Sequence, residues 1–118
     1  SDSVGSRSSS YIVRAARDYI RNNYADAALS LNAAADALSV STGYLSRVFK
    51  DQTGQNFSEY LQSVRMERAQ QLLATTVIPT NAVAEQTGYS NSTYFRAAFK
   101  ARFGLTPRQY RQTQSGNQ

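Results

Sequence analysis

Two residue types that support much of enzyme chemistry are missing from this chain of 118 residues, which contains neither cysteine nor histidine. Their absence excludes disulfides, thiol nucleophiles and imidazole bases, and it removes the usual ligands of zinc and haem. A metal or hydrolytic site would have to rely on the eight carboxylates, which form no recognisable motif. We therefore expect no enzymatic activity, no cofactor and no metal site.

Long hydrophobic runs are also missing, and proline is scarce. No stretch approaches the ~18 consecutive apolar residues that a membrane-spanning helix needs, and the chain has only two prolines. Hydrophobic residues nevertheless make up 41% of the sequence, which is enough for a modest core. These features predict a folded, mostly helical protein in the cytoplasm, with no membrane contact.

Negative charge is scarce in the later part of the chain. Residues 1–40 contain four Arg and four Asp, whereas residues 41–118 contain nine basic and four acidic residues and so carry the whole net charge of +5. Eleven of the thirteen basic residues are Arg, whose planar fork of donors suits phosphate and guanine. The pattern favours a nucleic-acid partner, although any single basic residue could simply belong to a solvated face.

Apolar residues recur at helical spacing along most of the chain, which predicts an all-α fold of seven helices and no strand. The predicted helices cover residues 11–23, 31–38, 42–52, 57–74, 79–87, 92–103 and 107–112. Their predicted caps are Ser10, Ser30, Ser41, Asn56, Asn91 and Thr106, and Pro79 and Pro107 fit a first helical position. The Ser-rich residues 1–10 are predicted to be a disordered tail or linker, and residues 113–118 a frayed tail.

An internal repeat relates two pairs of these helices. The pair Ala35-Asp36 recurs as Ala84-Glu85, 49 positions later. The residues Tyr44, Leu45, Phe49, Lys50 and Gly54 recur 50 positions later as Tyr94, Phe95, Phe99, Lys100 and Gly104. Each copy has the outline of a helix-turn-helix. We therefore predict two such subdomains, 11–56 and 75–112, joined by a linker helix over 57–74.

The linker helix has a defined start and length. Asn56 and Glu59 have the spacing of a capping box. Eighteen residues give a rod of roughly 27 Å, shorter than the ~34 Å repeat of duplex DNA. Two recognition helices at the ends of this rod would therefore not match successive major-groove segments of straight DNA, unless the tilt of the helices or a bend in the DNA compensated for the difference.

The second helix of each copy has one apolar and one polar face. Leu45, Val48 and Phe49, and likewise Phe95, Ala98 and Phe99, are predicted to face inward. The outward residues are Thr42, Gly43, Ser46, Arg47 and Lys50 in the first copy and Ser92, Thr93, Arg96, Ala97 and Lys100 in the second. Short or fork-shaped polar side chains in the N-terminal half of a helix suit base edges in the major groove.

Arg47 and Arg96 are the main candidates for reading bases, because Arg bound to guanine is the commonest specific contact. Phosphate binding or an ion pair, such as Arg47 with Asp51, is the alternative. Gly43 either allows close approach to DNA or is neutral variation at an exposed site. The candidate phosphate contacts are Lys50, Lys100, Arg102, Arg108 and Arg111, the last three in a stretch without acidic residues.

For several other residues, the sequence allows a structural role as well as a functional one. Arg65 and Arg68 on the linker helix could pair within the protein, since Glu67 adjoins them. The Phe residues have core spacing, which argues against a stacking platform for single strands. Tyr44 and Tyr94 could face either way.

Two segments resemble a known family: LSRVFKDQTGQNFSEYL at 45–61 and VAEQTGYSNSTYFRAAFKARFGLTPRQYR at 83–111. They are similar to the DNA-binding domain of AraC/XylS bacterial transcription regulators, and the resemblance covers residues 11–112. It implies two helix-turn-helix subdomains whose second helices read successive major-groove segments of double-stranded DNA. The base-reading positions of that family match Thr42, Gly43, Ser46 and Arg47, and Ser92, Thr93, Arg96 and Ala97.

The resemblance also shapes the expected partners. It implies a sensing or dimerisation domain outside this chain, and RNA polymerase is a further candidate partner. Two positions depart from the family pattern: Ala97 cannot hydrogen-bond a base, and Thr80 stands where the family commonly has an apolar residue. The competing hypothesis is a helical protein-interaction module that docks on an acidic partner through its basic face.

Overall fold

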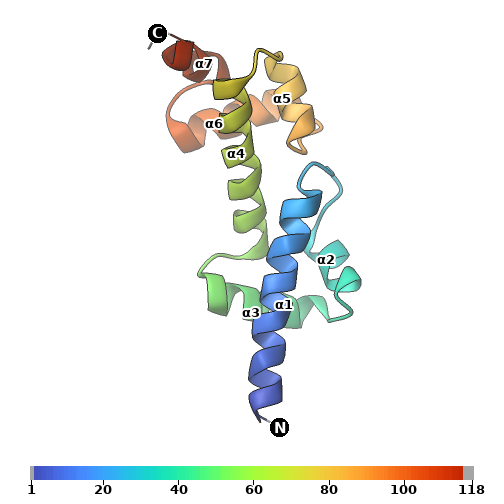
Figure 1. Ribbon diagram of the computed structural model, residues 1–118. Coiled ribbons are helices and arrows are strands. Elements are labelled where there is room, and N and C mark those ends of the chain that lie inside the picture. The colour runs from blue at the N-terminus through green and yellow to red at the C-terminus, as the bar shows by residue number, and fades with distance from the viewer. Residues whose placement is uncertain (1, 116–118) are drawn as a thin grey trace. The chain divides into compact units, whose positions relative to one another are not determined.

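The computed structural model describes residues 2–115, and this range forms seven α-helices without a strand (Figure 1). The all-α prediction is therefore confirmed. The helices are α1 (Asp2–Asn23), α2 (Leu31–Ala37), α3 (Thr42–Thr53), α4 (Phe57–Thr75), α5 (Thr80–Gln86), α6 (Ser92–Phe103) and α7 (Pro107–Ser115).

The chain divides into two compact units. The first consists of Ser1–Tyr24 and Ala28–Val64, and the second of Ala25–Ala27 and Arg65–Gln118. The first unit therefore contains α1, α2, α3 and the start of α4, and the second contains the rest of α4 with α5, α6 and α7. The short segment 25–27, which follows α1 in the sequence, packs with the second unit.

The start of α1 differs from the sequence prediction. The helix begins at Asp2 rather than at residue 11, so Ser10 lies inside it and does not cap it, and residues 2–10 are helical instead of a disordered tail. The helix is fixed from Val13 onward by burial of one face. Once a helix is nucleated, each added residue extends it at little cost, and no proline stops the extension here.

The predicted caps of the two helix-turn-helix units are present. The side chains of Ser30, Ser41 and Asn91 accept hydrogen bonds from the N–H groups of Ala33, Tyr44 and Tyr94 at 3.0–3.1 Å. Both α3 and α6 end at a glycine in the left-handed conformation, Gly54 with φ 79° and Gly104 with φ 80°. These helices therefore begin and end where local sequence chemistry requires.

Pro79 lies one residue outside the helix that it was predicted to begin. It occupies the N-cap position of α5 with an extended ψ of 153°, and the first helical residue is Thr80. The Pro79 carbonyl still accepts the first helical hydrogen bond, from the Val83 N–H at 3.0 Å. The helix also ends a residue early, at Gln86, with Thr87 as its C-cap and Gly88 following at a positive φ of 94°.

Each unit has its own aromatic core. In the first, the Phe49 ring lies 5.7 Å from the ring of Phe57 and 5.3 Å from that of Tyr60. In the second, the Phe99 ring lies 4.6 Å from Phe103 and 5.8 Å from Tyr110. The predicted inward faces are confirmed, since Leu45, Val48, Phe49, Phe95 and Phe99 are buried and Ala98 is partly buried. These cores set the outward faces of α3 and α6.

Candidate nucleic-acid interface

The outward face of α3 carries the predicted polar residues. Thr42, Gly43, Arg47 and Lys50 are exposed and Ser46 is partly exposed. The face can hold position because Leu45, Val48 and Phe49 anchor the other side of the helix. The outward side of α3 therefore presents hydroxyls, an exposed backbone position and two cations.

Arg47 is oriented by its neighbour Tyr44. The guanidinium carbon lies 5.6 Å from the centre of the Tyr44 ring, within the range of a cation–π contact. Tyr44 itself is partly buried and packs against the first core, which settles its direction. Arg47 therefore extends over an anchored ring near the N-terminal half of α3.

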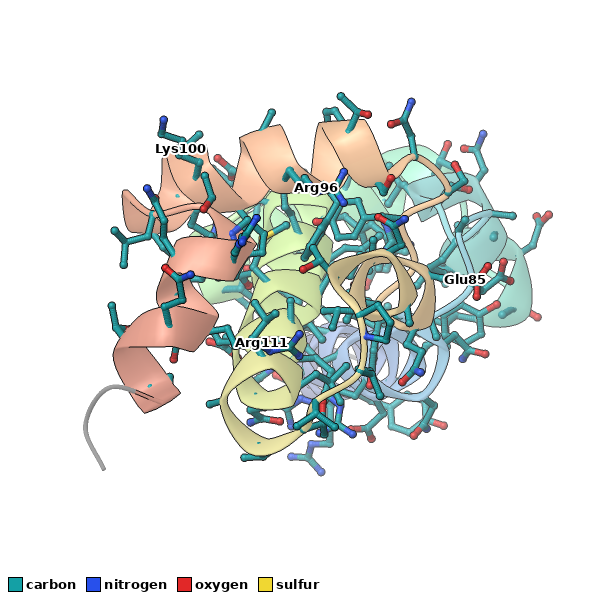
Figure 2. All side chains as sticks on the ribbon, turned by 90° about the horizontal axis from the view of Figure 1, so that it is seen from above. Glu85, Arg96, Lys100 and Arg111 are labelled. Carbon is teal, nitrogen blue, oxygen red and sulfur yellow. The ribbon has the colours of Figure 1, made fainter. Side chains whose placement is uncertain are left out.

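The outward face of α6 is equivalent but is held differently. Thr93, Arg96, Ala97 and Lys100 are exposed, and Ser92 is partly exposed. The Arg96 Nη2 donates to the Asn81 Oδ1 of α5 at 2.7 Å. Figure 2 shows Arg96 extending from α6 toward α5 and Lys100 pointing away from the rest of this unit.

Tyr94 faces outward, unlike its counterpart Tyr44. Its side chain is 58% exposed, while its ring remains 6.1 Å from that of the buried Tyr89. An exposed aromatic ring at the start of α6 adds an apolar contact surface beside the cationic one. The alternation of apolar and polar residues could not decide this direction, because Tyr94 lies at the boundary of the two faces.

Arg102, Arg108 and Arg111 were expected to bind phosphates, and the structure separates them. Arg102 and Arg108 are exposed. Arg111 is partly buried and donates from Nε to the Leu73 carbonyl at 3.3 Å and from Nη2 to the Thr76 carbonyl at 3.2 Å. It lies beside the end of α4 (Figure 2), where it satisfies helix-terminal carbonyls. This placement supports a structural role and does not support the expected phosphate contact.

The two arginines of α4 make contacts within the second unit. Arg65 donates from Nη2 to the Asp26 carbonyl at 2.9 Å, and its guanidinium lies 5.7 Å from the centre of the Tyr89 ring. Burial lowers the pKa of the Arg65 guanidinium, and the charges of Tyr89 and Asp26 act in the opposite direction. Arg68 donates to the Gln71 Oε1 at 3.0 Å. Both arginines therefore bind groups within the protein, as one of the two interpretations expected, but their partners are residues other than Glu67.

Asn81 is not among the residues that the sequence pattern predicted for this face, although the internal repeat contains a signal for it. The repeat that relates Ala35-Asp36 to Ala84-Glu85 also places Asn32 opposite Asn81. Recurrence of an amide at the same exposed position marks it as a residue with a role on that face. Its hydrogen bond to Arg96 depends on the distance between α5 and α6, which the spacing of residues does not report.

The outward faces of α3 and α6 carry groups that can bind an anionic partner. Among residues 2–115, no cluster of three or more carboxylates is arranged to hold a metal ion, and no described helix is both long and apolar enough to cross a membrane. The groups on α3 and α6 are hydroxyls, guanidinium and ammonium donors, and aromatic rings. These groups suit recognition of an anionic, hydrogen-bonding surface.

Two units of this kind, each with a short capped helix, a turn and an exposed basic second helix, define a protein with paired helix-turn-helix motifs. The model of a family described as a helix-turn-helix domain matches residues 34–113. The transcriptional regulatory protein YesN of Bacillus subtilis is 38% identical over 86 residues, which cover 71% of this chain and 23% of YesN. This chain thus spans about a quarter of that relative.

Solved structures agree with this class. The C-terminal domain of AraT, a response regulator from Geobacillus stearothermophilus, is 43% identical with a TM-score of 0.85, covering 86% of this chain and 84% of that one. An AraC-type regulator from Chromobacterium violaceum is 28% identical with a TM-score of 0.80, covering 94% and 96%. The chain belongs to the AraC/XylS family of bacterial transcription regulators and corresponds to the helix-turn-helix domain of that family.

Proposed function

We propose that this domain binds double-stranded DNA in a sequence-specific way, with α3 and α6 entering successive major-groove segments. One observation carries the proposal: both helices expose an Arg in the N-terminal half and a Lys about one turn further along, Arg47 with Lys50 and Arg96 with Lys100. A recognition helix needs this order, because its N-terminal residues reach base edges while later residues meet the phosphates.

The proposed base-reading residues differ between the two helices. They are Thr42, Gly43, Ser46 and Arg47 on α3, and Ser92, Thr93, Arg96 and Ala97 on α6. Ala97 has no polar group, so its contact would be with a thymine methyl. Each helix therefore offers two hydroxyls and one Arg for hydrogen bonds to bases, and the helices differ in the order of the last two positions: Ser46 and Arg47 on α3, Arg96 and Ala97 on α6.

The proposed phosphate contacts are Lys50, Lys100, Arg102 and Arg108, which are all exposed. Arg111 is left out of this set because its guanidinium binds the end of α4.

We further propose that the domain acts in the cytoplasm within a longer regulator that carries a sensing or dimerisation domain. RNA polymerase is a proposed partner of that regulator, and no catalytic role is proposed for the domain.

Salt dependence tests the proposal, since a protein that neutralises several phosphates loses affinity steeply as salt rises. A duplex would first be selected from a random library, and its affinity measured by fluorescence anisotropy between low and physiological salt. Lys100→Ala is expected to reduce the slope of log K against log salt by about one unit. Arg14→Ala, which removes an equal charge from an exposed position on α1, is the matched control.

Two outcomes would overturn the proposal. Affinity for the duplex that stays flat over the salt range would show that phosphate neutralisation is not the basis of binding. Equal affinity for the selected duplex and for an acidic polypeptide such as polyglutamate would favour a protein-interaction module instead.

A further inference from the structure

The guanidinium of Arg96 is held in place before any ligand is bound. Its Nη2 donates to the Asn81 Oδ1 at 2.7 Å, although the two residues are 15 positions apart and lie on different helices. Both side chains are exposed, so the contact is on the surface that faces outward, and Figure 2 shows Arg96 reaching across toward α5. The bond is therefore made by two side chains that the fold leaves free to meet a partner.

The chemistry of this contact leaves Arg96 able to read a base. A guanidinium has five N–H donors, and the Asn81 amide oxygen uses one of them. A bidentate contact with guanine needs two. Because the amide is neutral, it orients the guanidinium without cancelling its charge. An Asp in the same place would bind the guanidinium more strongly but would add a negative charge beside the phosphates.

We propose that Asn81 is a positioning residue that sets the base preference of Arg96, an inference that rests on the proposed function of α6 in DNA reading. A free Arg side chain loses about 2 kcal/mol of rotamer entropy when it is fixed. Fixing part of it in advance reduces what binding must supply. Asn81 thereby favours the orientation of Arg96 in which one Nη2 hydrogen faces the Asn81 Oδ1 and the other four donors stay available.

The first helix-turn-helix unit provides an internal comparison. Asn32 on α2 is the counterpart of Asn81, but the counterpart of Arg96 on α3 is Ser46, which has no guanidinium. The arginine of α3 is one position later, at Arg47, and lies over the Tyr44 ring instead. The two units therefore position their arginines by different contacts, and Asn32 supplies a matched control for Asn81.

The test compares base preferences of the wild-type chain with those of Asn81→Ala, Asn32→Ala and Arg96→Ala. Each protein is measured against the selected duplex and against duplexes that carry every single base-pair change. Asn81→Ala is expected to relax preference by about three- to tenfold, the net effect of a typical single hydrogen bond, at the base pair that Arg96→Ala also relaxes. Asn32→Ala is expected to leave preference at that base pair unchanged.

A further arm separates positioning from a merely structural contact. In the Arg96→Ala background, Asn81→Ala should cause no further change in base preference, because the guanidinium that it orients is gone. Asn81→Asp keeps the accepting oxygen, so it should retain the preference while weakening binding to every sequence. Thermal unfolding followed by circular dichroism confirms that each variant is folded.

The outcomes distinguish this inference from the function on which it rests. If Arg96→Ala relaxes a base pair and Asn81→Ala does not, the positioning role is wrong and DNA reading by Arg96 stands. Equal relaxation by Asn32→Ala and Asn81→Ala also overturns the role. If Arg96→Ala itself changes no preference, base reading by Arg96 is wrong and the positioning role falls with it.

Discussion

Asn56 and Glu59 exchange two hydrogen bonds at the start of α4: the Asn56 N–H donates to the Glu59 Oε1 at 2.9 Å, and the Glu59 N–H donates to the Asn56 Oδ1 at 2.8 Å. The same reciprocal pair begins α7, where the Thr106 and Gln109 bonds are 3.0 and 3.1 Å. These positions are 50 residues apart, so the internal repeat extends to the cap of the helix that follows each helix-turn-helix.

Removing the Asn56 side chain should destabilise the fold. Asn56→Ala is expected to lower the free energy of unfolding by about 1 kcal/mol, because the Glu59 N–H loses its partner in a free helix end. Urea denaturation measures the change. Ser58→Ala, at a neighbouring exposed position, is the control and should change stability by less than about 0.5 kcal/mol. Equal stability of Asn56→Ala and the wild type would contradict the importance of this cap.

Substitutions of Arg111 and Arg108 are expected to affect different properties, the stability of the fold and the affinity for DNA respectively. Arg111→Met keeps most of the aliphatic stem but removes two hydrogen bonds to the end of α4, so it should cost about 1–2 kcal/mol of unfolding free energy with a small change in affinity. Arg108→Met should leave stability within about 0.5 kcal/mol of wild type while lowering affinity for every duplex. Urea denaturation and anisotropy titration on the same preparations check both. The reverse pattern would show that the two assignments are exchanged.

Gly43 offers a test of close approach to DNA. An added Cβ would meet no atom within 4 Å in the free protein, so Gly43→Ala should raise the free energy of unfolding by about 0.5–1 kcal/mol through better helix propensity. We expect the same change to weaken DNA binding several-fold, since the methyl group would lie between the backbone and the groove. Affinity that is unchanged or higher would show that Gly43 is distant from DNA.

Gly54→Ala is the control for this effect. Gly54 also has open space around an added Cβ, but its φ of 79° is a conformation that residues with a side chain rarely adopt. The substitution should therefore lower the free energy of unfolding, by about 1 kcal/mol, instead of raising it. Thermal or urea unfolding of the two variants side by side gives opposite signs if this account of the two glycines is right.

The features that sequence predicted well depend on local chemistry. Ser41, Asn91 and the Asn56–Glu59 pair act on backbone groups within three residues, so spacing alone was enough to predict them. The inward faces of α3 and α6 followed from the helical period, because a helix that covers a core must bury one side. The internal repeat then reinforced each local assignment with a second copy.

The features that the sequence did not predict depend on distances between helices. Arg111 and Arg108 are indistinguishable in a basic stretch, and only the packing of α7 on α4 turns the Arg111 guanidinium toward the Leu73 carbonyl. The contact between Asn81 and Arg96 similarly requires the spacing of α5 and α6. The start of α1 was misplaced because composition predicted a disordered tail, whereas the helix continues to Asp2.

The proposed function requires that α3 and α6 each recognise their own group of base pairs. Its most direct test is a base-by-base comparison of binding by wild type, Arg47→Ala and Arg96→Ala, using a duplex selected from a random library. Arg47→Ala should relax preference at one group of base pairs and Arg96→Ala at a second, separate group, each by about 1–3 kcal/mol of discrimination. A result in which both variants relax the same base pairs, or in which neither changes any preference, would contradict the account.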